Sequence, residues 1–122
     1  VFKVAIVGAP VTDWRLYDSI YAERYMGLLD DNKEGYIQSA STTHAAKLQG
    51  KMLIAHASMD ENVHIQNTMQ LVKALTDAGI DADLRIYPPG AHGVAYNMAS
   101  YILLYQTYTN YLDEHLRDLA YD

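Results

Sequence analysis

Two residues of this 122-residue chain have the types and the order of the acid and the base of a hydrolytic triad. Asp60 lies in the run HASMDENVH, and His92 follows it in the run YPPGAHG. In one large class of Ser–His–Asp enzymes the nucleophile precedes the acid, the acid precedes the histidine, and the serine lies in a Gly-x-Ser-x-Gly turn. No such turn occurs here, and none of the five serines has flanking glycines. The sequence therefore offers an acid and a base without a nucleophile.

The segments around Asp60 and His92 can bring the two side chains together although 32 positions separate them. Residues 52–57 have the apolar character of a buried strand, and residues 83–87 have the pattern of a strand with Leu84 and Ile86 on one face. Asp60 follows the first of these segments, and His92 follows the second. Residues 65–78 between them repeat apolar side chains at helical spacing. In open α/β sheets the functional site gathers at the carboxyl ends of the strands. We expect the carboxylate to contact the imidazole there and to fix its tautomer.

Strand and helix alternate along the chain, which predicts βαβ units and a parallel sheet. The expected strands cover residues 4–7, 52–57 and 83–87, the expected helices cover 14–25, 65–78 and 100–119, and one or two helical turns cover 42–48. Residues 27–38 are expected to be a solvated loop, because they are rich in glycine, aspartate and asparagine. Three strands are few for an independent doubly wound domain, and their sheet edges would be exposed. We therefore expect further strands on the N-terminal side.

Composition and motifs argue against several other functions. The net charge is −6 and the basic residues are scattered, so no nucleic-acid partner is expected. The absence of cysteine excludes disulfides, thiolate metal sites and thiol catalysis. No glycine-rich phosphate loop and no membrane-length apolar run occurs, and no cofactor is expected. His56, Asp60 and His64 are spaced by four, as metal ligands on one helix would be, but 52–57 is predicted to be a strand, so we expect no metal.

Three segments together resemble a known family. They are APVTDWRLYDSIYAERYMG, the run HASMDENVHIQ around Asp60 and the run YPPGAHGV around His92. They are similar to the C-terminal catalytic region of the dipeptidyl peptidases in the prolyl oligopeptidase family of serine peptidases. The similarity extends over nearly the whole chain, and the first segment is the longest and most specific. It implies the C-terminal portion of an α/β-hydrolase fold, with parallel strands flanked by helices and with residues 1–122 as the C-terminal part of a peptidase domain.

The resemblance implies a role for eight residues. Asp60 would be the triad acid, His92 the general base, and Asn62 a side chain that binds a substrate carbonyl near the amino end. The walls of a pocket for proline or alanine, the second residue of the substrate, would be Tyr17, Tyr21, Val11, Trp14 and Val63. An aromatic slot suits a proline ring, which has no amide hydrogen to satisfy. Without the resemblance, the spacing of the two tyrosines also fits core packing. Glu61 stands where the family commonly has a second Asp, which keeps the charge.

The resemblance also implies parts outside this sequence. The nucleophile elbow would lie shortly upstream of residues 4–10, and an oxyanion-hole tyrosine and a β-propeller with paired glutamates would lie elsewhere in the parent. We therefore expect a serine exopeptidase that releases X-Pro or X-Ala dipeptides from peptide substrates, whereas the isolated chain is expected to be inactive. The parent is expected to be extracytoplasmic. It is also expected to form a homodimer, in which helix 100–119 could contribute Tyr101, Tyr105, Tyr108 and Leu112.

Two hypotheses without peptidase activity compete with the serine exopeptidase. A non-catalytic hydrolase-like binding module would explain the missing elbow. A complete small flavodoxin-like protein would explain the alternation of strands and helices and would bind a ligand at its strand ends. The set of Asp60, Asn62 and His92 favours the peptidase, because a binding module has no need of an acid and a base in working loops.

Overall fold

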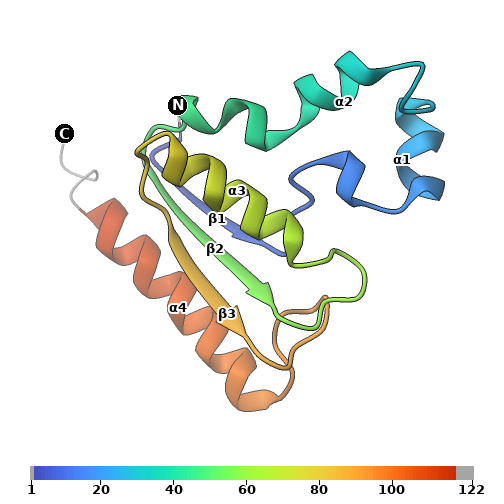
Figure 1. Cartoon of the computed structure of the whole chain (residues 1–122). Helices are drawn as coiled ribbons and strands as arrows, with labels where there is room; N and C mark the ends of the chain where they lie inside the picture. The colour runs from blue at the N-terminus through green and yellow to red at the C-terminus, as the bar shows by residue number, and fades with distance from the viewer. Residues whose placement is uncertain (1, 118–122) are drawn as a thin grey trace.

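The computed structural model describes residues 2–117 as a three-stranded parallel sheet with helices on both faces (Figure 1). The strands are β1 (Val4–Gly8), β2 (Lys51–Ala57) and β3 (Asp83–Tyr87), which lie in the order β1-β2-β3. The helices are α1 (Ser19–Met26), α2 (Lys33–Ser39), α3 (Gln66–Asp77) and α4 (Met98–Leu116), with two 3-10 helices, η1 (Trp14–Leu16) and η2 (Ser41–Lys47). The predicted α/β fold is confirmed, and each predicted strand agrees to within one residue at either end.

The central strand β2 directs apolar side chains to both faces of the sheet. Ile54 packs on one face in a cluster with Leu71 and Leu75 of α3. Ala55 packs on the other face in a cluster that includes Leu104 of α4. Five consecutive residues of β2 are buried, which is the burial expected of a parallel strand covered by helices on both sides.

The register of the three strands places their carboxyl ends at one edge of the sheet. Gly8 of β1 is level with Ala55 of β2, and Ala57 at the end of β2 is level with Tyr87 at the end of β3. The loops that follow β2 and β3 therefore leave the sheet side by side (Figure 1). These are the two loops in which the acid and the base were predicted.

The single helix predicted over 14–25 is wrong. The chain forms η1, takes an extended conformation at Tyr17 (φ −116°, ψ 171°), and then begins α1. Asp13 and Asp18 explain the break, because each side chain accepts a backbone amide hydrogen bond at the start of its own helix. Two N-caps five residues apart start two short helices, although the apolar spacing continues across both.

The solvated loop predicted over 27–38 is also wrong in its second half, where α2 forms. The side chain of Asn32 caps this helix by accepting the backbone amide of Gly35 at 3.2 Å. Tyr36 anchors the helix, since its ring is only 2% exposed and its hydroxyl donates to the carbonyl of Gly27 at 2.8 Å. The polar residues that suggested a loop form the turn and the cap before a short helix.

The remaining predicted helices are present. The turns over 42–48 correspond to η2, and the helix over 65–78 corresponds to α3. The last helix starts at Met98, two residues earlier than predicted, because Asn97 and Ser100 form a capping box. Its predicted end at 119 lies outside the described residues. Among residues 2–117, no helix has both the length and the apolar character that a membrane span requires.

Candidate active site

Asp60 lies in the loop after β2, and only 3% of the residue is exposed. Its Oδ1 atom accepts backbone amide hydrogen bonds from Asn62 at 3.0 Å and Val63 at 2.9 Å. A buried carboxylate must have such partners, because an unpaired charge is costly to remove from water. The acid loop therefore fixes one carboxylate oxygen by itself and leaves Oδ2 for contacts with other segments.

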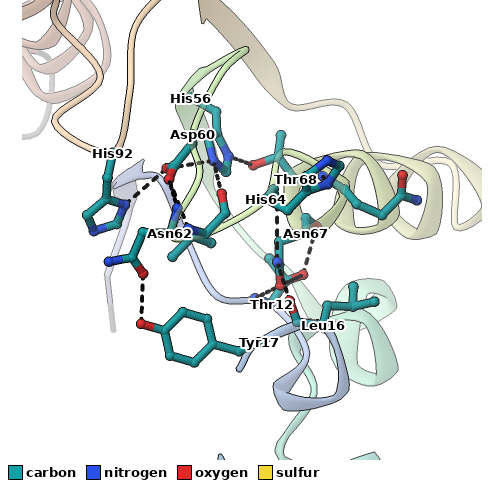
Figure 2. Close-up of polar contacts among 12 residues, drawn as sticks. Thr12, Leu16, Tyr17, His56, Asp60, Asn62, His64, Asn67, Thr68 and His92 are labelled. Atoms are coloured by element: carbon teal, nitrogen blue, oxygen red, sulfur yellow. Dashed lines mark hydrogen bonds and ion pairs between the residues drawn. The ribbon is translucent and has the colours of Figure 1, made fainter. Parts of the chain in front are cut away.

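His92 lies in the loop between β3 and α4, and its Nδ1 atom is 3.0 Å from Oδ2 of Asp60 (Figure 2). The predicted contact between the two side chains is confirmed. A carboxylate can only accept at this distance, so the proton of a neutral His92 ring is on Nδ1. The ring is 47% exposed, and its Nε2 atom has no hydrogen-bond partner within residues 2–117. This nitrogen is thus free to accept a proton.

A close backbone contact joins the loops that carry the two residues. The amide of Met59 donates to the carbonyl of Gly90 at 3.1 Å, and the amide of Gly90 donates to the carbonyl of Tyr87 at 2.9 Å. A Cβ atom on Gly90 would collide with the carbonyl oxygen of Val94. Glycine is therefore required here by the close approach of the backbone. The contact sets the path of the chain two residues before His92.

The electrostatics of Asp60 favour its charged form. Burial alone would raise the pKa of Asp60. The hydrogen bond from His92, the amides of Val63 and Asn62, and the charge of a protonated His92 ring outweigh burial and hold the pKa below its ordinary value. The carboxylate is therefore ionised at neutral pH, and an ionised carboxylate is what stabilises a neighbouring imidazolium.

Three predicted aromatic side chains, from η1 to the first turn of α1, form one group. The rings of Trp14 and Tyr21 are stacked, with centroids 5.6 Å apart and an interplanar angle of 20°. Tyr17 packs edge-on against both rings, at 6.0 Å and 5.7 Å. Tyr21 is 47% exposed, and the other two are half-buried. The group therefore lines an accessible surface, which argues against core packing of the tyrosines.

Asn62 connects this aromatic group to the acid loop. The hydroxyl of Tyr17 donates to Oδ1 of Asn62 at 2.8 Å, the contact marked between the two side chains in Figure 2. Val63 and Val11 lie in less open positions, since Val63 is 3% exposed and Val11 is half-buried. Of the side chains predicted to form a pocket, the aromatic rings and Asn62 are thus more accessible than Val63.

Sequence reasoning missed a second imidazole at Asp60. His56 is fully buried in β2, and its Nε2 atom lies 3.2 Å from Oδ2 of Asp60 and 2.8 Å from the carbonyl oxygen of Val63. Its Nδ1 atom lies 2.7 Å from the hydroxyl of Thr68 in α3 (Figure 2). The only sequence signal is position, because His56 follows Ile54 by two residues and therefore faces the same helical layer.

A buried amide, Asn67, was also missed. Its Oδ1 atom accepts the backbone amide of Thr12 at 3.0 Å, and its Nδ2 atom donates to the carbonyls of Leu16 at 3.3 Å and His64 at 3.2 Å. The hydroxyl of Thr12 donates back to the carbonyl of Asn67 at 2.7 Å. These bonds attach the segment with the aromatic group to the first turn of α3. The sequence shows only a polar residue within an amphipathic helix, so nothing in it indicates burial.

The spacing of His56, Asp60 and His64 does not produce a ligand set. The ring of His64, which precedes α3, is turned to the start of that helix, where its Nδ1 atom accepts the amide of Gln66 at 3.1 Å. Within residues 2–117, no three histidine or carboxylate side chains are grouped in a way that could hold a metal ion.

Comparison with known proteins identifies the family of this chain. The sequence profile of the prolyl oligopeptidase family matches residues 1–119. The chain belongs to the prolyl oligopeptidase family. This confirms the resemblance found in the three segments around Trp14, Asp60 and His92.

Individual relatives carry dipeptidyl peptidase names. The chain is 46% identical over 102 residues to dipeptidyl peptidase 4 of Sus scrofa, which covers 81% of the chain and 13% of that protein. It is 39% identical over 110 residues to dipeptidyl aminopeptidase A of Saccharomyces cerevisiae, with 88% of the chain and 12% of that protein covered. The crystal structure of Porphyromonas gingivalis dipeptidyl peptidase 4 matches with a TM-score of 0.91 and 42% identity, over 94% of this chain and 16% of that one. The chain thus spans about one eighth of the length of the curated relatives.

Proposed function

We propose that this chain supplies the acid and the base of a serine peptidase that releases N-terminal X-Pro or X-Ala dipeptides. The contact between Asp60 and His92 carries the proposal, because it joins a buried, ionised carboxylate to a half-exposed ring with a free Nε2 atom. In such a reaction, Nε2 takes the proton of a serine hydroxyl as its oxygen attacks the substrate carbonyl, and later returns the proton to the leaving amine. Asp60 stabilises the imidazolium formed in between. The names of the relatives support the choice of peptidase.

The proposed pocket for the second residue of the substrate consists of Trp14, Tyr17 and Tyr21. The packed aromatic rings offer an apolar surface that fits a proline ring or an alanine methyl group. A proline residue also has no amide hydrogen that the pocket would need to satisfy. Asn62 would hold the substrate backbone beside this pocket. Because its Oδ1 atom already accepts the Tyr17 hydroxyl, its Nδ2 group is left to donate to a substrate carbonyl.

We also propose that the nucleophilic serine and the rest of the hydrolase domain pack against β1. Within the described part of the chain β1 pairs only with β2, and most of its residues are half-buried, although parallel strands are normally covered on both sides. An apolar hollow of about 420 Å³ lies between β1, η2 and α3, with Val7, Leu48 and Leu75 among its lining residues. Further strands beyond β1 would pair with its open edge, and the segments that connect them would cover the apolar hollow.

The decisive experiment uses the longer enzyme that carries this chain. We expect it to hydrolyse Gly-Pro and Ala-Pro chromogenic substrates and to be labelled by a serine-directed fluorophosphonate, and both properties should be lost in His92→Ala. A folded parent with neither property would support the non-catalytic binding module instead.

The isolated chain 1–122 provides the complementary test of the missing nucleophile. We expect it to be inactive on the same substrates, since an imidazole alone offers no acyl-enzyme route. We also expect it to self-associate in light scattering through the open edge of β1. Turnover that survives repurification and disappears in His92→Ala would contradict the placement of the serine outside this chain.

We propose the outer face of α4 as part of a homodimer surface of the parent. Tyr101 and Tyr105 are each 53% exposed and Leu112 is 39% exposed, whereas Tyr108 packs partly against the core. Exposed aromatic groups of this kind are enriched in protein interfaces. In sedimentation experiments, the double variant Tyr101→Glu/Tyr105→Glu should shift the parent towards monomer. An unchanged sedimentation coefficient would argue against this surface.

A further inference from the structure

One carboxylate oxygen of the site, Oδ2 of Asp60, contacts two imidazole rings. Oδ2 of Asp60 lies 3.0 Å from Nδ1 of His92 and 3.2 Å from Nε2 of His56 (Figure 2). The side chain of His92 is 47% exposed, whereas that of His56 is fully buried. Only His92 can therefore reach a substrate. His56 can influence the chemistry only through the acid loop, where its Nε2 atom faces Oδ2 of Asp60 at 3.2 Å and the carbonyl oxygen of Val63 at 2.8 Å.

The partners of His56 determine where its proton lies. The carbonyl oxygen of Val63 and the carboxylate of Asp60 can only accept, and both face Nε2, so Nε2 carries a proton. The Thr68 hydroxyl faces Nδ1 at 2.7 Å and can donate to it. A neutral ring with its proton on Nε2 therefore satisfies every group around it, without a second buried charge.

We propose that His56 is a positioning residue that holds the Asp60 carboxylate in the orientation required by His92. Two backbone amides hold Oδ1, and the two imidazole N–H groups hold Oδ2, so neither oxygen can rotate away. His56 is the buried member of this set, and it keeps Oδ2 in place when the exposed His92 ring moves. This inference rests on the proposed peptidase function of the Asp60–His92 pair.

The same hydrogen bond has an electrostatic consequence. A donor to a carboxylate stabilises its charge and makes it a weaker acceptor for other donors. By donating to Oδ2, His56 moderates how strongly Asp60 holds the protonated His92 ring. Removal of the donor should make that ring harder to deprotonate, so the enzyme would need a higher pH to have its base in the active form.

Other ionisable groups near the carboxylate do not provide this effect. Glu61 and His64 from the same loop are exposed, and the ring of His64 is turned to the amide of Gln66. From the segment after β1, the phenol of Tyr17 faces Asn62 rather than the acid. From α3, the contact is made by the neutral hydroxyl of Thr68. Within residues 2–117, His56 and His92 are the ionisable side chains that contact Asp60.

The test compares His56→Leu with His56→Gln in the longer enzyme. Leucine fills a similar volume without a donor, whereas glutamine can place an amide N–H near the position of Nε2. For His56→Leu we expect kcat to fall by about tenfold or more, as happens when supporting hydrogen-bond partners are removed at metal sites. We also expect the acidic limb of the kcat/KM profile to move to higher pH. His56→Gln should restore both properties towards wild type.

A matched control separates positioning from packing. Ile54→Val alters a fully buried side chain on the same face of β2, so it should lower stability without moving the acidic limb. An acidic limb in His56→Leu that coincides with wild type would overturn the inference, whatever happens to kcat. If Asp60→Asn and His92→Ala retain turnover, the peptidase proposal itself fails. If they abolish turnover and the limb does not move, only the role of His56 fails.

A direct measurement on the wild-type protein covers the case in which the leucine variant does not fold. Long-range ¹H–¹⁵N spectra of the histidine rings, recorded at the pH of the activity assay, should show His56 as the neutral form with its proton on Nε2. A His56 ring with its proton on Nδ1 could not donate to Asp60 and would overturn the inference.

Discussion

The hydroxyl of Tyr17 donates a 2.8 Å hydrogen bond to Oδ1 of Asn62 and thereby joins the segment after β1 to the loop after β2. The two residues are 45 positions apart in the chain. One side of this contact belongs to the aromatic group, and the other belongs to the loop that also carries Asp60. The proposed pocket and the acid–base pair are therefore held in register by a side-chain contact as well as by the sheet.

Replacement of Tyr17 by phenylalanine should weaken substrate binding. The ring and its packing remain, but Asn62 loses the hydroxyl that orients its amide. We expect KM for Gly-Pro substrates to rise by about fivefold to tenfold, the effect of one hydrogen bond, with kcat nearly unchanged. Tyr21→Phe is the matched control, since no hydrogen bond of the Tyr21 hydroxyl occurs within residues 2–117. An equal rise in KM for both variants would mean that the contact with Asn62 is not the cause.

Replacement of Asp60 by asparagine should remove nearly all peptidase activity. The neutral amide cannot stabilise the imidazolium and does not enforce the Nδ1–H form of His92. From the corresponding change in other triads, we expect kcat to fall by about 10⁴-fold in steady-state assays of the longer enzyme. Glu61→Gln removes the adjacent exposed charge and should retain most of the activity. A similar loss in both variants would point to a general effect of charge on this loop.

Asp13 should make stability depend on pH. Burial alone would raise the pKa of Asp13, but the side-chain and backbone hydrogen bonds from Arg15 and its charge hold that pKa below the ordinary value. The stabilisation is therefore present above the unfolded-state pKa of about 4 and is lost as the pH falls through the lower folded-state value.

The variant Asp13→Asn tests this dependence, because it keeps an N-cap side chain and removes the charge. We expect a decrease in the free energy of unfolding of about 1 kcal/mol at pH 7, since Arg15 is partly exposed to solvent. The difference from wild type should shrink in urea titrations below about pH 4. Asp31→Asn, which changes an exposed carboxylate, should show no such trend. A difference that stays constant with pH would exclude the ion pair as its source.

The sheet and the central contact could be predicted because they follow from patterns that are local in sequence. Apolar runs define β1 and β2, and the alternation of Leu84 and Ile86 with charged residues defines β3. The carboxyl ends of parallel strands meet at a common edge, where the acid and the base lie in contact. The glycines and prolines before His92 indicated a tight loop. No long-range information was needed for these conclusions.

The errors occur where one polar side chain changes the outcome. The apolar spacing across Tyr17 is helical, but the caps at Asp13 and Asp18 separate two helices. In α2, the burial of Tyr36 overrides a polar composition. The role of His56 depends on the neighbouring loop and helix, because a histidine within a strand has no partner that the sequence can identify. The spacing of apolar residues therefore cannot predict which contacts a single polar side chain makes in the folded protein.

Replacement of Gly90 by alanine should damage both stability and catalysis. The added methyl group would collide with the carbonyl of Val94 and would lie 3.1 Å from the side chain of Ala57 and from the carbonyl of Tyr87. Such overpacking typically costs about 1–3 kcal/mol of unfolding free energy. The loop can relieve the collision only by moving, and a displacement of His92 by about 1 Å could lower kcat by about 10²-fold.

Gly93→Ala provides the control within the same loop, on the other side of His92. A Cβ atom at Gly93 meets its nearest neighbour, the carbonyl oxygen of Ala95, only at 4.0 Å, so it adds no strain. We therefore expect nearly wild-type kcat and thermal midpoint for Gly93→Ala, measured beside the losses in Gly90→Ala. If both variants lose activity equally while remaining folded, the loop needs flexibility near the base. The close approach at Gly90 would then not be what positions His92.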